Sequence, residues 1–179
     1  MCEKIIQDYA TTYGINYTNL RLFNVAGSNN GKFGYQKDPL KHVLPILVQA
    51  GLLGETFTIN GNEYPTADGT AVRDYTHVVD VAKAFHNTAS FMLDTSLSGT
   101  INIGNNNPVS LLELIAEVES QLEKPIHTLV TQGRAGDMLQ THADITVADT
   151  VLGWQPELST EDIVADEIRW QKTKLKKYL

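Results

Sequence analysis

The chain has 179 residues, 42% hydrophobic and 20% charged, which is ordinary for one folded domain or two small lobes with a real core. Its formal net charge of −7 argues against non-specific binding to nucleic acid or to an anionic membrane. No apolar run approaches the ~20 residues of a membrane span, and no basic-then-apolar N-terminus suggests secretion. The single Cys2 excludes an internal disulfide and fits a cytoplasmic protein, and the five histidines show no metal-ligand spacing.

Predicted helices and strands follow one another along the chain. Apolar spacing predicts helices over residues 1–13, 42–53 and 79–93. Runs of β-favouring residues predict strands over 17–24, 56–59, 100–103 and 126–130. Ser110, followed three residues later by Glu113, predicts a capping box at the start of a helix that runs to residue 123. A short helix over 144–152 and a last one from 159 or 160 to about 176 complete an α/β pattern.

Residues 27–41 form a long polar loop between the first strand and the second helix. Gly27, Gly31 and Gly34 follow a strand, as the glycines of a dinucleotide-binding turn do. The spacing is G-x-x-x-G-x-x-G, however, and the next residues do not start a helix that could offer its amides to a pyrophosphate. A substrate-side loop is therefore favoured over a cofactor turn. Since the loop has few apolar anchors, we expect it to be poorly ordered without ligand.

The sixteen residues NGNEYPTADGTAVRDY, 60–75, are the most informative segment. Gly61-Asn62 and Asp68-Gly69 are turn dipeptides, with Pro65 between them. Residues 71–78 then look extended, and they place Arg73 where the loop returns. A guanidinium is a planar, permanently charged fork, so it suits a phosphate or carboxylate.

The block YPTADGTAVRDYTHVVD resembles the YPTxDGTxVRDYIHVxD signature of UDP-glucose (UDP-galactose) 4-epimerases, which are extended short-chain dehydrogenase/reductase enzymes. The resemblance covers essentially all of the chain, as the C-terminal half of such an enzyme. It implies the C-terminal part of an NAD(P)-binding Rossmann-type fold with a small mixed substrate-binding lobe. Residues 1–26 would be the last helix and strand of the Rossmann domain. Residues 27–179 would form the UDP-sugar-binding lobe, with some returning sheet elements, and Arg73 would grip the diphosphate.

Two further segments extend the resemblance to the UDP-sugar and cofactor sides. LRLFNVAG is similar to the family's LRYFNxxG, whose asparagine, here Asn24, contacts the UDP-sugar. Leu22 replaces the tyrosine usual at its position, and with Val25 it is expected on the cofactor side. HVLP is similar to the family's HLIP, which implies nucleotide contacts for His42 and Val43, although a plain helix start explains these residues equally well.

The remaining implied contacts concern the nucleotide. RAGD is similar to the family's R-x-G-D, so Arg134 would meet the diphosphate and Asp137 a ribose hydroxyl. Thr141 would lie beside the diphosphate or sugar, and Thr58 and Asn60 would flank a strand that pairs with uracil through its backbone. The segment NNNPVS, 105–110, is nearer to uronate and N-acetylhexosamine 4-epimerases and leaves the sugar open.

The resemblance implies epimerisation at C4 of a UDP-hexose, in which NAD takes and returns a hydride while a tyrosine with a neighbouring lysine acts as base. Neither that Tyr-x-x-x-Lys pair nor the G-x-x-G-x-x-G turn occurs in these residues. We therefore expect this chain alone to hold no NAD and to be inactive, and its start to resemble the stretch just past the lysine. A nucleotide-sugar-binding remnant, an inert fragment, and a related nucleotide-sugar dehydratase or decarboxylase stay as alternatives. A homodimer, or self-association through the N-terminal helix, is expected from its apolar face, Ile5, Ile6, Tyr9 and Ala10.

Overall fold

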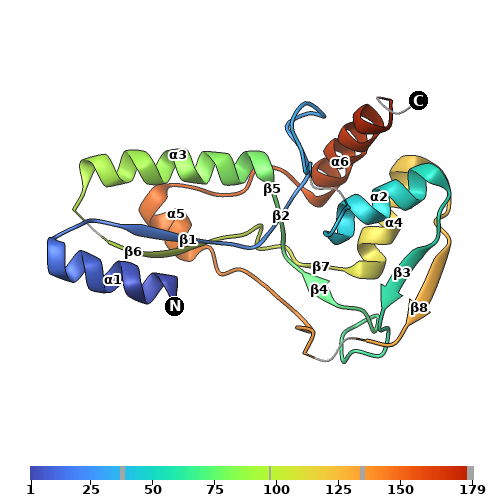
Figure 1. The fold of residues 1–179 in the computed structure, drawn as a ribbon, viewed down its shortest axis with the longest axis horizontal. Coiled ribbons are helices and arrows are strands. Elements are labelled where there is room, and N and C mark those ends of the chain that lie inside the picture. The colour runs from blue at the N-terminus through green and yellow to red at the C-terminus, as the bar shows by residue number, and fades with distance from the viewer. Residues whose placement is uncertain (37–38, 97, 134–135, 177–179) are drawn as a thin grey trace.

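The computed structural model describes residues 1–36, 39–96, 98–133 and 136–176. Two lobes lie side by side along the long axis of the molecule, and short strands join them (Figure 1). Each lobe has its own cluster of buried apolar side chains. The fold is α/β, as predicted, and three of the four strand pairs in the described residues are parallel.

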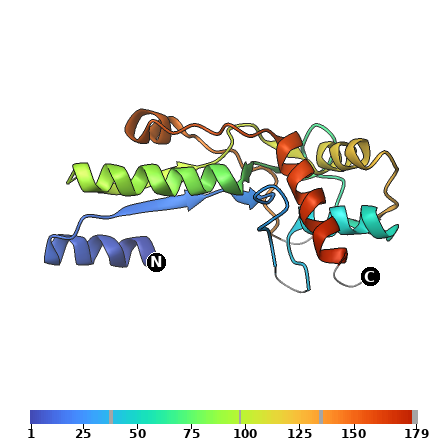
Figure 2. The same cartoon turned by 90° about the horizontal axis from the view of Figure 1, so that it is seen from above.

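The first lobe is built on a parallel pair of strands. It contains α1 (Cys2–Tyr13), β1 (Thr18–Leu22), α3 (Val78–Asp94), β6 (Gly99–Ile103) and α5 (Thr146–Leu152). β1 pairs with β6 from Thr18↔Gly99 to Leu22↔Ile103. Ile101 and Ile103 of β6 are buried against α3, α5 and Trp154. Helix α3 therefore covers one side of β1, while α1 lies on the other (Figure 2).

Helix α1 is loosely held, because none of its residues is buried. Its link to the strand is an ion pair in which Arg21 donates from Nε and Nη2 to the two carboxylate oxygens of Glu3, at 2.8 and 2.7 Å. Both side chains are about half exposed. The predicted apolar face is open to solvent, since Ile5 is 51% exposed and Tyr9 57%.

The second lobe packs three helices against a second parallel strand pair. It contains α2 (Val43–Leu53), β3 (Phe57–Asn60), α4 (Leu111–Leu122), β8 (Thr128–Thr131) and α6 (Thr160–Leu175), and β3 pairs with β8. The predicted capping box of α4 is confirmed, since Ser110 and Glu113 each accept the other's backbone N–H. A second capping box, between Ser159 and Asp162, starts α6. Leu47, Leu114 and Ile163 are completely buried at the centre of this lobe.

Four short strands cross between the lobes. β2 (Asn24–Ala26) pairs in parallel with β5 (Tyr75–His77), and β4 (Val72–Arg73) pairs antiparallel with β7 (Val109–Ser110). The single strands predicted over 17–24 and 71–78 are therefore each broken. Phe23 still donates its N–H to Ile103, but the Asn24 N–H goes to the carbonyl of Asp74, so the chain changes partner strand there. Asp74 breaks the other run.

None of the helices in the described ranges is long and apolar enough to cross a membrane.

Candidate functional site

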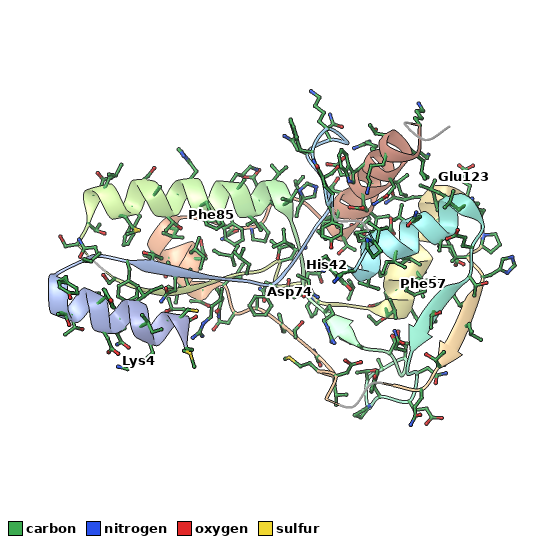
Figure 3. All side chains as sticks on the ribbon, viewed as in Figure 1. Lys4, His42, Phe57, Asp74, Phe85 and Glu123 are labelled. Atoms are coloured by element: carbon green, nitrogen blue, oxygen red, sulfur yellow. The ribbon has the colours of Figure 1, made fainter. Side chains whose placement is uncertain are left out.

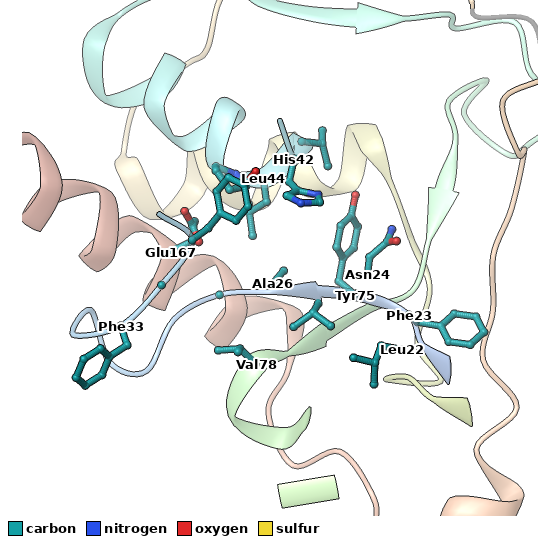
Figure 4. Close-up of a pocket in the computed structure, with 16 residues that line it drawn as sticks. Leu22, Phe23, Asn24, Ala26, Phe33, His42, Leu44, Tyr75, Val78 and Glu167 are labelled. Atoms are coloured by element: carbon teal, nitrogen blue, oxygen red, sulfur yellow. The ribbon is translucent and has the colours of Figure 1, made fainter. Parts of the chain in front are cut away.

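A cavity of about 720 Å³ opens where the two lobes meet (Figure 4). It lies at β2, the turn over residues 33–35 and the start of α2. Five residues predicted to contact ligand line it together: Leu22, Asn24, Val25, His42 and Val43. Because ligands of α/β proteins bind beyond the carboxyl ends of parallel strands, this position suits a ligand.

The cavity walls are mostly apolar but carry oriented polar groups. His42 is the N-cap residue of α2, and its ring meets the edge of Tyr35, with ring centroids 4.8 Å apart. Tyr75 lines the floor and is buried. Burial raises the pKa of its phenol to about 12, although the charge of Arg73 acts to lower it. Tyr75 therefore stays a neutral hydroxyl at neutral pH, next to a cation.

Arg73 and Thr141, both predicted to lie near the diphosphate, are on neighbouring segments. The Val72 N–H donates to the carbonyl of Leu139 and the Thr141 N–H to that of Val72, so the segment 139–141 runs along β4. Arg73 donates from Nη1 to the carbonyls of Val72, at 2.8 Å, and Leu139, at 3.5 Å. Within the described ranges, its Nε and Nη2 make no hydrogen bond, and the buried hydroxyl of Thr141 also has no partner. Donors for an anion therefore gather beside β4.

Tyr64 joins two other predicted residues. Its hydroxyl lies 3.3 Å from the carbonyl oxygen of Asn60 and 3.3 Å from Oδ2 of Asp137. Cβ atoms at Gly61 and Gly133 would come within 2.8 and 2.7 Å of that hydroxyl, so a side chain at either position would push the Tyr64 hydroxyl from its place. Asn60 ends β3, and its side chain accepts from Thr131 at 3.3 Å. Thr58 lies on the exposed side of β3, and Arg134 lies outside the described residues.

Asp74 is a residue of the site that the sequence reasoning missed. Its side chain is completely buried at the junction of the lobes (Figure 3). Oδ1 accepts the N–H of Asn105 at 2.6 Å, and Oδ2 accepts those of Asn106 and Ala143 at 3.1 and 3.0 Å. One carboxylate therefore holds the β6–β7 loop and the segment after Thr141 against the strand of Arg73. Its place next to Arg73 in RDY was the available signal.

In the described residues, neither a metal site nor a glycine-rich turn for the pyrophosphate of a dinucleotide is present. No cluster of three metal-ligating His, Cys, Asp or Glu side chains occurs in the part of the chain that the structure describes. Leu22 and Val25 form an apolar part of the cavity wall. In the described residues, the glycine segment leads into no helix before α2 at Val43, and the N–H of Gly31 donates to Oγ of Ser28. The described part of this segment therefore offers no helix N-terminus for the pyrophosphate of a dinucleotide.

Parallel strands between helices, with a cavity at the strand ends and a cation beside it, place this chain among α/β proteins of Rossmann type. It belongs to the NAD dependent epimerase/dehydratase family, whose pattern matches residues 1–104. The predicted family and fold class are thereby confirmed.

Known relatives agree with this assignment. The chain is 35% identical to a UDP-glucose 4-epimerase of Halalkalibacterium halodurans, over 95% of this chain and 52% of that protein. It is 36% identical to the Lactobacillus helveticus UDP-glucose 4-epimerase, over 99% of this chain and 55% of that protein. The chain thus spans about half the length of the curated relatives it matches.

Solved structures give the same result. The UDP-glucose 4-epimerase of Stenotrophomonas maltophila, described with bound NAD and formylated UDP-arabinopyranose, superposes with a TM-score of 0.94 at 30% identity, over 98% of this chain and 54% of that one. The Bifidobacterium longum UDP-glucose 4-epimerase, described in complex with NAD+ and UDP, has a TM-score of 0.90 at 30% identity, over 97% of this chain and 52% of that one.

Proposed function

We propose that this chain is the UDP-sugar-binding portion of an NAD-dependent UDP-hexose 4-epimerase, which interconverts UDP-glucose and UDP-galactose. One observation carries the proposal: residues from distant segments converge at the junction of the lobes. Asn24 and His42 line the cavity, while Arg73 and Thr141 lie together beside β4. Relatives named as UDP-glucose 4-epimerases, two of them with solved structures, support the same ligand class.

The chemistry of each group suits one part of a UDP-sugar. The free edge of the Arg73 guanidinium and the Thr141 hydroxyl suit a diphosphate. The Asp137 carboxylate could accept hydrogen bonds from the cis-diol of a ribose. The backbone N–H and C=O groups of β3 could pair with the edge of a uracil. NAD, when bound in the whole enzyme, would supply the hydride acceptor. The proposal includes a cytoplasmic location, supported by the single free Cys2.

The decisive experiment is a calorimetric titration of the chain with UDP. An arginine–phosphate bond is worth ~1.5–3 kcal/mol when shielded from water, so Arg73→Ala should weaken UDP at least ~10-fold. Arg73→Lys should restore only part of the affinity, because an ammonium lacks the planar fork. Arg21→Ala is the matched control, since that arginine pairs with Glu3 in the first lobe. Equal UDP affinities for the wild type and Arg73→Ala would reject the assignment.

We infer further that this chain alone binds UDP without catalysing epimerisation or holding NAD tightly. The support is that no Tyr-x-x-x-Lys pair occurs in its 179 residues. A coupled assay for conversion of UDP-galactose to UDP-glucose should therefore give no signal. Turnover by the isolated chain would refute this inference. UDP binding without turnover would fit both the binding portion of an enzyme and a non-catalytic binding remnant, and an in-frame TGxxGxxG and YxxxKL upstream would favour the enzyme.

A further inference from the structure

One wall of the cavity is fastened to the last helix, α6. Phe33, Gly34 and Tyr35 line the cavity, and they lie against the face of α6 that carries Trp170. The Trp170 indole Nε1–H donates to the carbonyl of Tyr35 at 2.8 Å. Gly34 packs so closely on the indole that a Cβ there would lie 2.6 Å from its Cγ. The backbone of the wall, rather than its side chains, is what the helix holds.

A second attachment lies one helical turn earlier, at Asp166. Its Oδ2 accepts the N–H of Asn30 at 3.1 Å, and its main-chain carbonyl accepts the hydroxyl of Ser28 at 2.8 Å. Ser28 is fully buried, and its Oγ in turn accepts the N–H of Gly31 at 2.9 Å. Asp166 and Trp170 are four residues apart, so they lie on one face of α6 and hold both ends of the segment 28–35.

The Asp166 carboxylate also lies next to His77 and Arg169. His77, almost fully buried, accepts the Val79 N–H at Nδ1, at 3.1 Å, so its neutral form carries the hydrogen on Nε2. Nε2 lies 3.3 Å from Oδ2 of Asp166, although it is not aligned as a hydrogen bond. Arg169 pairs with the other carboxylate oxygen, Oδ1. His77 also ends β5, the strand of the cavity residue Tyr75, so Asp166 lies close to the end of that strand as well.

We propose that Asp166 and Trp170 are positioning residues for the cavity, which act by holding the backbone of residues 28–35 on α6. Neither Asp166 nor Trp170 is among the residues that line the cavity. Phe33, Gly34 and Tyr35 line the cavity through this attachment, and Tyr35 in turn supports the ring of His42. The shape of the cavity wall formed by residues 33–35 thus depends on α6, whose Trp170 lies 135 residues after Tyr35.

Hydrogen exchange followed by mass spectrometry tests this attachment without any ligand. Asp166→Ala and Trp170→Phe should each speed exchange of the segment 28–35 about tenfold, because each removes one hydrogen bond that holds it. The matched controls are Asp149→Ala, at an exposed carboxylate on α5, and Trp154→Phe, whose indole donates to Asp80 in the first lobe. Both should leave residues 28–35 unchanged. Unchanged exchange in the Asp166 and Trp170 variants, or equal acceleration throughout the second lobe, would overturn the proposal.

A binding measurement tests the consequence for the ligand, and this arm alone rests on the proposed function. The Asp166→Ala variant should weaken both UDP and UDP-glucose several-fold, because the wall that Asp166 holds supports His42, a predicted nucleotide contact in the cavity. Unchanged affinities for both compounds would refute the positioning role. If the wild type binds neither compound, the proposed function fails, while the exchange result still decides whether α6 holds the wall.

Discussion

At the scale of single residues, the buried carboxyl of Glu167 lowers the stability of the folded state when it is ionised. It is 1% exposed, lines the cavity, and accepts one hydrogen bond from Gln171. Burial raises the pKa of its carboxyl from 4.5 to about 6, although the Gln171 bond and the charge of Lys174 act to lower it. The folded state therefore holds this proton more tightly than the unfolded chain does, and stability falls as the pH rises from about 4.5 through 6.

This pH dependence gives a direct test in Glu167→Gln. The variant should be more stable than the wild type at pH 8, by at most about 2 kcal/mol, because it removes a buried charge. Well below pH 4.5 the two proteins should be equally stable, since the carboxyl is then protonated in both states. Urea unfolding at several pH values measures the difference, with the exposed Glu55→Gln as control. A variant that is equally or less stable at pH 8 would contradict the assignment.

At the scale of elements, Asp74 joins three segments that would otherwise separate. Asp74→Asn should destabilise the protein by about 2–4 kcal/mol. The NH2 group of asparagine would replace one carboxylate oxygen, so two hydrogen-bond donors would face each other where a backbone N–H is now accepted. UDP should also bind less well, since the segment after Thr141 loses its anchor. Thermal unfolding measures the first effect and calorimetry the second. Asp149→Asn, on the surface of α5, should change neither.

Elements with local signals could be predicted from the sequence. The capping box of Ser110 and Glu113 is a contact between residues three apart, and the apolar spacing of residues 43–53 marks a buried face within one helix. Arg73 could be placed on an extended segment in the same way. The breaks at Phe23 and Asp74 could not be foreseen, because each depends on backbone hydrogen bonds to distant strands or loops.

The anchors of the cavity wall, residues 28–35, also could not be predicted from the sequence. The loop over residues 27–41, which includes the segment 28–35, is predicted from the sequence to be poorly ordered without ligand, because few apolar side chains could anchor it. The anchors of this segment are instead hydrogen bonds to Asp166 and Trp170, which the spacing of the glycines cannot reveal. How far this segment moves without ligand stays a prediction for the exchange experiment. Likewise, Tyr64 was part of the signature, but its contact with Asp137, 73 residues later, required the structure.

At the scale of the whole molecule, the exposed apolar face of α1 predicts self-association. Ile5, Ile6, Tyr9 and Tyr13 are 40–66% exposed on one helix with no buried residue. Light scattering should show a dimer or larger species, and Tyr9→Glu should shift it towards monomer. Leu129→Glu, on the exposed strand β8 of the other lobe, is the control and should leave the mass unchanged. A wild-type monomer at high concentration would rule out this role for α1.

Because the Arg21–Glu3 ion pair joins α1 to β1, the attachment of this helix should depend on ionic strength. The pair is open to solvent, and the Debye length falls from ~10 Å at 0.1 M salt to ~3 Å at 1 M. Concentrated salt should therefore release α1 from β1 while it strengthens the apolar contacts within both cores. Trypsin cleavage after Lys4, in α1 itself, should become faster in 1 M sodium chloride, and Glu3→Gln should show that faster cleavage already at low salt. Helix α1 would then lie against β1 at low salt, and at high salt it would be detached from β1 and joined to it only through the chain.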